Sequence, residues 1–130
     1  MITIYTDGSC SPNPGKGGWA YIALTYNKDV IAFGKSAKTT NNIMELTAVI
    51  KALKDFSKQT DFLFCSDSLY VINCAQGKWK RKKNIELWKK YDKYSQGKNI
   101  QWKWVKGHAS DKYNNLVDAE ARKAIDNETN

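Results

Sequence analysis

Hydrophobic residues follow two different spacings along the chain, and their order predicts a mixed α/β fold. Apolar runs typical of strands occupy residues 2–6, 19–26, 30–38, 61–66 and 99–105. Apolar residues three or four positions apart, typical of helices, occupy residues 43–56, 68–75, 85–94 and 116–125. The order β-β-β-α-β-α-α-β-α describes a mixed sheet covered by helices, in one domain over residues 1–127 with a short tail at 128–130.

Turn-forming and capping residues mark where these elements are expected to begin and end. The first strand is expected to end at Asp7, because residues 8–18 are dense in glycine, proline and asparagine. Asn41 or Asn42 is expected to cap the long helix. Three tryptophans have neighbours that alternate or repeat as core positions do, and we assign them to the core: Trp88, Trp102 and Trp104.

Charge is concentrated in one part of the chain. The formal net charge is +8, and residues 76–106 alone hold eleven basic and two acidic side chains, a net charge of +9. Clustered lysine and arginine gain affinity by releasing phosphate counterions, so this segment indicates a polyanionic partner. A solvated, lysine-rich surface without such a partner is the alternative.

Cysteine number and hydropathy narrow the class of protein. Three cysteines without CxxC spacing favour free thiols in a reducing cytoplasm over a disulfide framework or a zinc site. The chain has no run of 18 apolar residues, and its first residues lack the features of a signal peptide. We therefore expect a cytoplasmic protein that has no membrane span.

Four acidic residues lie where a metal site is expected. Asp7 and Asp67 each follow an apolar strand, Glu45 lies in the first turn of the long helix, and Asp118 lies near the start of the last helix. Sites in open sheets collect at the carboxyl ends of neighbouring strands, so Asp7 and Asp67 are expected side by side. Clustered carboxylates are stable together only when they share protons or bind cations, and oxygen ligands favour Mg²⁺ or Mn²⁺.

Each acid alone also has an ordinary structural explanation. Asp7 suits a turn, and Asp67 suits the N-cap of the helix after it. Glu45 is near the N-terminus of its helix, where an acid interacts favourably with the helix dipole. Asp118 is four residues before Arg122, as in an intrahelical ion pair. Spacing alone does not decide between these roles and a metal site.

Five motifs, in the same order, resemble those of type 1 ribonuclease H over residues 4–124. They are Tyr5-Thr6-Asp7-Gly8-Ser9-Cys10, Asn13-Pro14-Gly15 with Gly17-Gly18-Trp19, Thr39-Thr40-Asn41-Asn42-Ile43-Met44-Glu45-Leu46, Cys65-Ser66-Asp67-Ser68-Leu69-Tyr70-Val71, and Trp104-Val105-Lys106-Gly107-His108-Ala109 with Asp118. The resemblance implies a ribonuclease H-like fold, a five-stranded mixed sheet with helices on both faces. It also implies an endonuclease that hydrolyses the RNA strand of RNA–DNA hybrids by two-metal-ion catalysis, leaving 5′-phosphate and 3′-hydroxyl ends.

The resemblance assigns a role to each acid. Asp7, Glu45, Asp67 and Asp118 would hold two Mg²⁺ ions, for which Mn²⁺ can substitute, and Asp7 would bridge both. Asp7 and Asp118 would hold the ion that carries the nucleophilic water, and Asp7, Glu45 and Asp67 the ion on the leaving-group side. His108, the only histidine, matches an auxiliary residue of a mobile loop that helps proton transfer or product release. A purely structural histidine is the alternative.

Substrate contacts are implied in the same way. Amide side chains and backbone groups both donate and accept, which suits recognition of the RNA 2′-hydroxyl. The RNA-strand contacts fall on Gly8, Cys10, Asn13, Asn41 and Asn42. A pocket for a phosphate of the DNA strand falls on Lys38, Thr40 and Asn84. The alternative is that the asparagines only shape turns and cap the helix.

The chain departs from many relatives at three places. Only residues 76–83 stand where many relatives insert a basic helix and loop, Lys38 replaces an arginine, and Asn115 replaces a glutamate. We predict that Trp79 packs against the sugars of the DNA strand while residues 78–83 contact its phosphates. Alternatively, Trp79 anchors the following helix in the core. No separate hybrid-binding domain is expected, and no motif demands more than a monomer.

The sequence also allows two functions of other kinds. One is a non-catalytic module that binds hybrids or duplexes, against which the four acids argue, because acids facing phosphate carry an electrostatic cost. The other is a different two-metal nuclease, such as a resolvase or a retroelement fragment. The Gly107-His108-Ala109 loop and the Asn41-Asn42 pair favour a cellular or phage-type enzyme over the retroelement.

Overall fold

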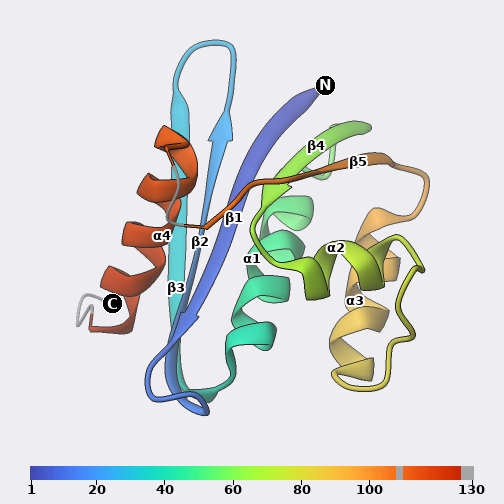
Figure 1. Ribbon diagram of the computed structural model, residues 1–130. Helices are drawn as coiled ribbons and strands as arrows, with labels where there is room; N and C mark the ends of the chain where they lie inside the picture. The colour runs from blue at the N-terminus through green and yellow to red at the C-terminus, as the bar shows by residue number, and fades with distance from the viewer. Residues whose placement is uncertain (108–109, 127–130) are drawn as a thin grey trace.

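The computed structural model describes residues 1–107 and 110–126. Its strands form one sheet in the order β3-β2-β1-β4-β5 (Figure 1). Their bounds are β1 Ile2–Cys10, β2 Gly15–Leu24, β3 Asp29–Thr39, β4 Asp61–Ser66 and β5 Asn99–Trp104. The pairs β1–β2 and β2–β3 are antiparallel, whereas β1–β4 and β4–β5 are parallel. The sheet is therefore mixed, as predicted.

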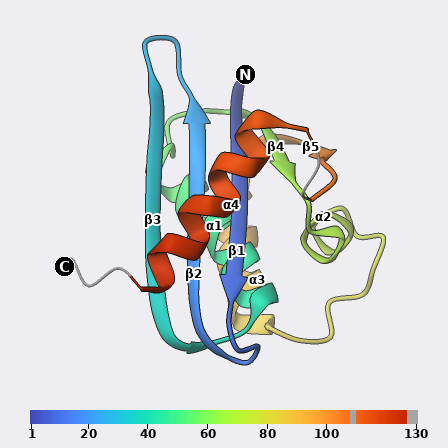
Figure 2. The ribbon, with the colours of Figure 1, turned by 60° about the vertical axis from the view of Figure 1, so that its left-hand side comes forward.

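Helices cover both faces of this sheet. Their bounds are α1 Asn41–Asp55, α2 Leu69–Ala75, α3 Ile85–Ser95 and α4 Lys112–Ile125. Helix α4 crosses one face, and α1 lies on the opposite face with α3 beyond it (Figures 1 and 2). The predicted α/β class is confirmed. In the described parts of the chain, no helix has the length and apolar character needed to cross a membrane.

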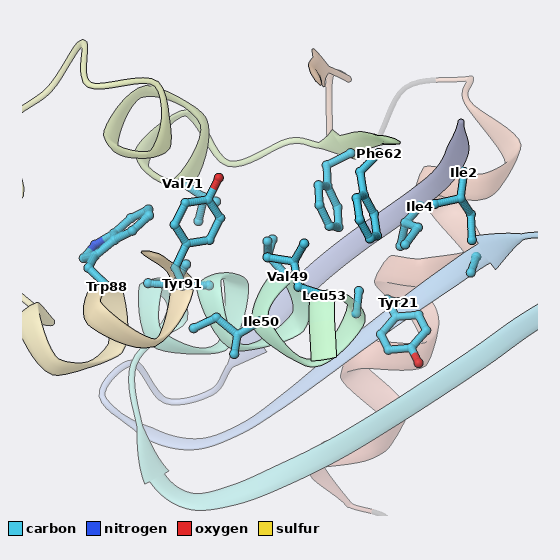
Figure 3. Packing of buried hydrophobic residues seen from close by; sticks show 14 of the residues in the cluster. Ile2, Ile4, Tyr21, Val49, Ile50, Leu53, Phe62, Val71, Trp88 and Tyr91 are labelled. Atoms are coloured by element: carbon cyan, nitrogen blue, oxygen red, sulfur yellow. The ribbon is translucent and has the colours of Figure 1, made fainter. Parts of the chain in front are cut away.

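A hydrophobic cluster fills the space on each side of the sheet. The larger one lies between the sheet and α1, α2 and α3, and Figure 3 shows Phe62, Leu53 and Trp88 among its members. Phe62 and Phe64 are two residues apart in β4, so both side chains point to this face, and their rings stack 5.6 Å apart. The smaller cluster lies under α4 and includes Ile22 and Val117.

Strand β1 is longer than predicted, which changes the setting of Asp7. The prediction ended this strand at Asp7, but its pairing with β2 continues to Cys10 opposite Gly17. Of the glycines that suggested a long loop, Gly8 belongs to β1, and Gly15, Gly17 and Gly18 belong to β2. A Cβ atom on Gly18 would lie 2.3 Å from the carbonyl oxygen of Ala121 in α4. Only the four residues between β1 and β2 form the turn.

The start of α1 also differs from the prediction. Thr40 is the N-cap residue, and its hydroxyl accepts a hydrogen bond from the Ile43 amide at 3.2 Å. Asn41 and Asn42 are the first two residues of the helix rather than its cap. Glu45 consequently lies just beyond the first turn. A threonine satisfies the exposed amides as an asparagine would, so composition alone did not separate the three positions.

Helix α4 begins at Lys112, four residues earlier than predicted. The side chain of Asp111 caps it by accepting a hydrogen bond from the Asn114 amide at 3.0 Å. The prediction missed this turn because its residues are polar and carry no apolar repeat. Asp118 therefore lies in the second turn of α4.

Two of the three tryptophans assigned to the core are packed there. Trp88 is buried, and Trp102 stacks on Phe64 with ring centroids 5.2 Å apart. The assignment of Trp104 is wrong, because this side chain is 50% exposed. Trp104 is the last residue of the outer strand β5, and its indole donates a hydrogen bond to the carbonyl oxygen of Asp67 at 3.3 Å.

Candidate metal centre

Parallel pairing of β1 with β4 places two acids side by side. Tyr5 pairs with Cys65; Asp7 lies two residues beyond Tyr5 in β1, and Asp67 lies two residues beyond Cys65, just past the end of β4. Glu45 joins them from α1, and one carboxylate oxygen from each of the three acids lies within 4.8 Å of the others. Strand register and helix packing thus bring together acids that are far apart in the sequence.

Gly8 makes the close approach of α1 to β1 possible. Its amide donates hydrogen bonds to Oε1 of Glu45 at 2.5 Å and to Oδ1 of Asp7 at 2.9 Å. A Cβ atom here would lie 2.3 Å from the amide nitrogen of Glu45 and 2.4 Å from the carbonyl carbon of Met44. The absence of a side chain at Gly8 therefore sets the distance between Glu45 and Asp7.

Asp118 reaches the same place from α4. A cavity of about 250 Å³ is lined by Asp7, Gly8, Ser9, Asn41, Glu45, Asp67, Asp118 and Arg122. Asp118 forms an ion pair with Arg122 one turn along the helix. The structural role weighed for Asp118 is thus present, and its carboxylate also faces the cavity. Asp67 does not cap α2, because Ser68 does so by accepting a hydrogen bond from the Val71 amide at 3.1 Å.

The acids are held in a setting that disfavours negative charge. Burial raises the pKa of Asp7 from 3.8 to about 7, the charge of Asp67 adds to this effect, and a hydrogen bond with Glu45 opposes it. Burial, followed by the charge of Asp7, raises the pKa of Glu45 well above its usual value. Protons or cations are therefore needed to balance the cluster near neutral pH.

The donor set fits a divalent cation with hard oxygen ligands. Asp7 is 3% exposed and Glu45 is 8% exposed. The Oδ2 atom of Asp7 is buried and has no hydrogen-bond partner among the described residues. This is expected of an oxygen that coordinates a cation. Carboxylate oxygens without histidine or cysteine favour Mg²⁺ or Mn²⁺ over zinc.

Without bound metal ions, the native protein should become less stable as the pH rises. We expect Asp7→Asn to lose less stability over the same pH range. A pKa raised from 3.8 to about 7 means that folding favours the protonated acid, so stability is lost as the pH rises through that interval. The amide cannot ionise and removes this contribution. Thermal unfolding in EDTA at about pH 5 and about pH 8 measures the difference.

Asp61→Asn is the matched control, since Asp61 begins the same β4 strand outside the cluster. It should keep the pH dependence of the native protein, and added Mg²⁺ should restore the stability of the native protein at high pH. An equal pH dependence in native protein and Asp7→Asn would contradict the electrostatic account.

Two of the predicted RNA-strand residues, Gly8 and Asn41, line this cavity. Asn41 lines it, and the Asn41 amide donates a hydrogen bond to Oδ1 of Asn13 at 3.2 Å. Cys10 ends β1, and its thiol donates to the carbonyl oxygen of Thr39 at 3.4 Å. Asn42 is exposed on the first turn of α1. The structure thus joins the β1–β2 turn to the start of α1 beside the acids.

The predicted DNA-phosphate residues belong to neighbouring elements. Thr40 caps α1 and Asn84 precedes α3, and these helices begin at the same end of the molecule (Figure 1). Asn84 lines a cavity of about 430 Å³ with Ile43, and its side-chain amide donates to the Tyr70 hydroxyl at 3.0 Å. Lys38 is exposed near the end of β3.

Trp79 is 48% exposed, so the alternative that placed it in the core is wrong. Its backbone amide donates to the carbonyl oxygen of Asn73, which holds the segment against the end of α2. His108, predicted as an auxiliary residue, lies outside the described residues.

Sequence reasoning gave Arg122 only a structural role and did not place Ser9 or Trp104 at the site. Arg122 lines the cavity itself, and its spacing of four residues from Asp118 was the available signal. Trp104 is connected through a backbone carbonyl of Asp67, and hydrogen bonds of this kind leave no pattern in a sequence.

Known proteins resemble the chain over nearly its whole length. A ribonuclease H (RNase H) family model matches residues 1–126. The ribonuclease H of Wolbachia sp. subsp. Drosophila simulans (strain wRi) is 48% identical, with 95% of this chain and 94% of the relative covered. The N-terminal RNase H domain of a Mycobacterium tuberculosis protein is 25% identical, with a TM-score of 0.85 and coverage of 96% and 93%.

A further solved structure agrees in fold. LC11-RNase H1, crystallised in complex with an RNA/DNA hybrid, has a TM-score of 0.84 at 24% identity, and 97% of each chain is covered.

Proposed function

The chain belongs to the ribonuclease H family, and we propose that it hydrolyses the RNA strand of RNA–DNA hybrids at the centre formed by Asp7, Glu45, Asp67 and Asp118. The observation that carries this proposal is the cluster of three acids from two strands and a helix, with ligand atoms within 4.8 Å. LC11-RNase H1, which shares the fold, was crystallised with such a hybrid. The products would carry 5′-phosphate and 3′-hydroxyl ends.

The four acids would hold two Mg²⁺ ions, or Mn²⁺ in their place. Bound ions of this kind would supply an activated water and would stabilise the leaving oxygen of a phosphodiester. Asp7 suits a position shared by both ions, because its ligand atom lies within 4.8 Å of those of Glu45 and Asp67 and it lines the same cavity as Asp118. The Gly8 amide orients both Asp7 and Glu45, and Arg122 orients Asp118.

Discrimination of RNA would arise at the β1–β2 turn and the start of α1. Asn41 lines the same cavity as the acids, and Asn13 is tied to it by a hydrogen bond. We assign contacts with the RNA 2′-hydroxyls to these two residues, to Asn42, and to the backbone at Gly8 and Cys10, where both donors and acceptors are available. His108 would assist proton transfer or product release.

The DNA strand would be held by Lys38, Thr40, Asn84 and the exposed part of the basic segment. Within that segment Arg81 serves a structural role. Its guanidinium donates to both carboxylate oxygens of Asp92 at 2.9 Å and to the carbonyl oxygen of Cys74 at 3.1 Å, and it lies 4.4 Å from the Trp88 ring centroid. These contacts fix the segment against α2 and α3, which leaves its lysines and Trp79 exposed for the substrate.

We expect replacement of Lys80, Lys82 and Lys83 by glutamine to weaken hybrid binding and to flatten its salt dependence by about one unit of slope for each phosphate that the variant no longer neutralises. Binding should be measured by fluorescence anisotropy in the Asp7→Asn background, so that the hybrid stays intact. The control removes three exposed lysines outside this segment, Lys28, Lys54 and Lys58. An unchanged salt slope in the first variant would refute the assignment of phosphate contacts to this segment.

Cleavage of strand-labelled substrates tests the function itself. The native protein, with Mg²⁺ or Mn²⁺, should cut the RNA strand of a hybrid and leave double-stranded DNA and double-stranded RNA intact. Binding of the hybrid without cleavage would instead favour the non-catalytic module. Cleavage of double-stranded DNA or of branched DNA would favour a different two-metal nuclease.

One chain should be sufficient for catalysis, because all four acids come from the same chain. We propose that the ribonuclease H domain spans residues 1–127 and acts in the cytoplasm. Its three cysteines are free, as is usual in a reducing compartment.

A further inference from the structure

Strand β3 is an outer strand of the sheet, and its second edge pairs with no other strand of the described chain. It runs over eleven residues, and its pairing with β2 is regular from Asp29 to Ser36. Outer strands of this length present free backbone groups to other chains unless proline, a bulge or a covering element protects them. The stretch from 29 to 35 contains neither proline nor a bulge.

Apolar side chains line this strand on one face. Ile31 pairs with Ile22 and Phe33 pairs with Ala20, and directly paired residues share a face, so both lie on the α4 side of the sheet. Helix α4 does not cover them, since Ile31 is 43% exposed and Phe33 is 47% exposed. Asp29 and Lys35 extend the same row at its two ends, and both are exposed.

The order of these four residues is self-complementary. We propose that two copies of the chain associate by antiparallel pairing of β3 with β3, centred on Ala32. In this register Ile31 lies opposite Phe33 of the second copy, and Asp29 lies opposite Lys35 of the second copy. Two-fold symmetry repeats both pairs. Aromatic pairs with β-branched residues and pairs of opposite charge are the cross-strand combinations that stabilise antiparallel ladders.

The other face of the same strand permits this approach. Val30 would lie opposite Gly34 of the second copy, over which the Trp19 ring lies, and Ala32 would lie opposite itself, so no large side chain of β3 itself stands on this face. Each chain has one β3 edge, so the contact closes at a dimer. The two sheets would join into one continuous ten-stranded sheet.

The pairing leaves the proposed catalytic unit intact. The metal centre is formed on β1 and β4, and β2 separates β1 from β3. Lys38 lies beyond the paired stretch. The proposal therefore does not depend on the proposed cleavage reaction, and each chain of the dimer keeps an accessible site.

A contact through one strand is small, so we expect a dissociation constant on the order of 100 µM, as for transient interfaces below about 1,200 Å². Sedimentation velocity from about 10 µM to about 1 mM should show the mass rising from the monomer value of 14.8 kDa toward twice that value. Amide hydrogen exchange in β3 should slow over the same range.

Charge exchange tests the register. Asp29→Lys and Lys35→Asp should each weaken association at least about tenfold, and the double variant should restore it, because the opposite charges again face each other. Phe33→Lys should remain monomeric at every concentration while it keeps the native circular-dichroism spectrum and a cooperative thermal unfolding transition, which shows that the fold is intact. Lys58→Asp, the same charge change away from β3, should associate like the native protein.

Three results would overturn the proposal. A native mass of 14.8 kDa at about 1 mM would exclude the dimer at the expected affinity. Association that persists in Phe33→Lys would place the interface elsewhere. A double charge variant that stays as weak as the single variants would exclude this register. None of these results bears on cleavage, so the proposed function is tested separately.

Discussion

Asp7→Asn should lower hybrid cleavage by at least about 1,000-fold, since removal of a ligand shared by both ions takes away several kcal/mol of transition-state stabilisation. Asp7 is the least exposed acid of the cluster, its ligand atom lies within 4.8 Å of those of Glu45 and Asp67, and it lines the same cavity as Asp118. An amide keeps the shape of the side chain but contributes no negative charge. The loss should therefore appear as a loss of metal binding with the fold preserved.

Single-turnover cleavage of a labelled hybrid measures the loss of rate, and calorimetric titration with Mg²⁺ measures the loss of metal binding. Asp61→Asn makes the same chemical change at the start of β4, where the carboxylate accepts a hydrogen bond from Asn99. This variant should retain native cleavage and native Mg²⁺ binding. If Asp7→Asn cleaves at the native rate, the metal ligands lie elsewhere and the proposed centre is wrong.

The order of elements could be predicted from the sequence because it depends on apolar spacing, which is a local property. The five strands and four helices of the described residues lie where the pattern placed them, within a few residues. The errors concern residues whose secondary structure or burial is determined by tertiary packing. Glycine is a loop residue by propensity, yet Gly17 and Gly18 stand in β2 because their missing side chains admit Met44 and α4. The exposure of Trp104 likewise depends on where the core ends and not on alternation within β5.

The candidate site was predictable to a different extent. Ordered motifs identified the acids, and strand register explains why two of them meet. Arg122 could not be placed in the cavity from its sequence position, because its i, i+4 pair with Asp118 is equally common on solvated helices. The raised pKa values of Asp7 and Glu45 follow from burial under α1, which no local pattern encodes.

Gly8→Ala should disrupt the centre without removing any ligand. The added methyl group would lie 2.3 Å from the Glu45 nitrogen and 2.4 Å from the Met44 carbonyl carbon, and both are backbone atoms that move only with α1. Relief of such overpacking costs about 1–3 kcal/mol of stability. It also carries Glu45 away from Asp7, and a displacement of about 1 Å in a catalytic group lowers the rate by about 100-fold.

Gly97→Ala separates the loss of stability from the loss of cleavage rate. A methyl group at Gly97 meets no atom within 4 Å, but the residue has a φ of 75°, so the substitution costs about 1 kcal/mol of backbone strain at a residue that does not line the acidic cavity. It should lower the unfolding midpoint and leave cleavage unchanged, whereas Gly8→Ala should lower both, even at temperatures where each variant is fully folded. Native cleavage and metal affinity in folded Gly8→Ala would show that the position of Glu45 does not depend on the contact between β1 and α1.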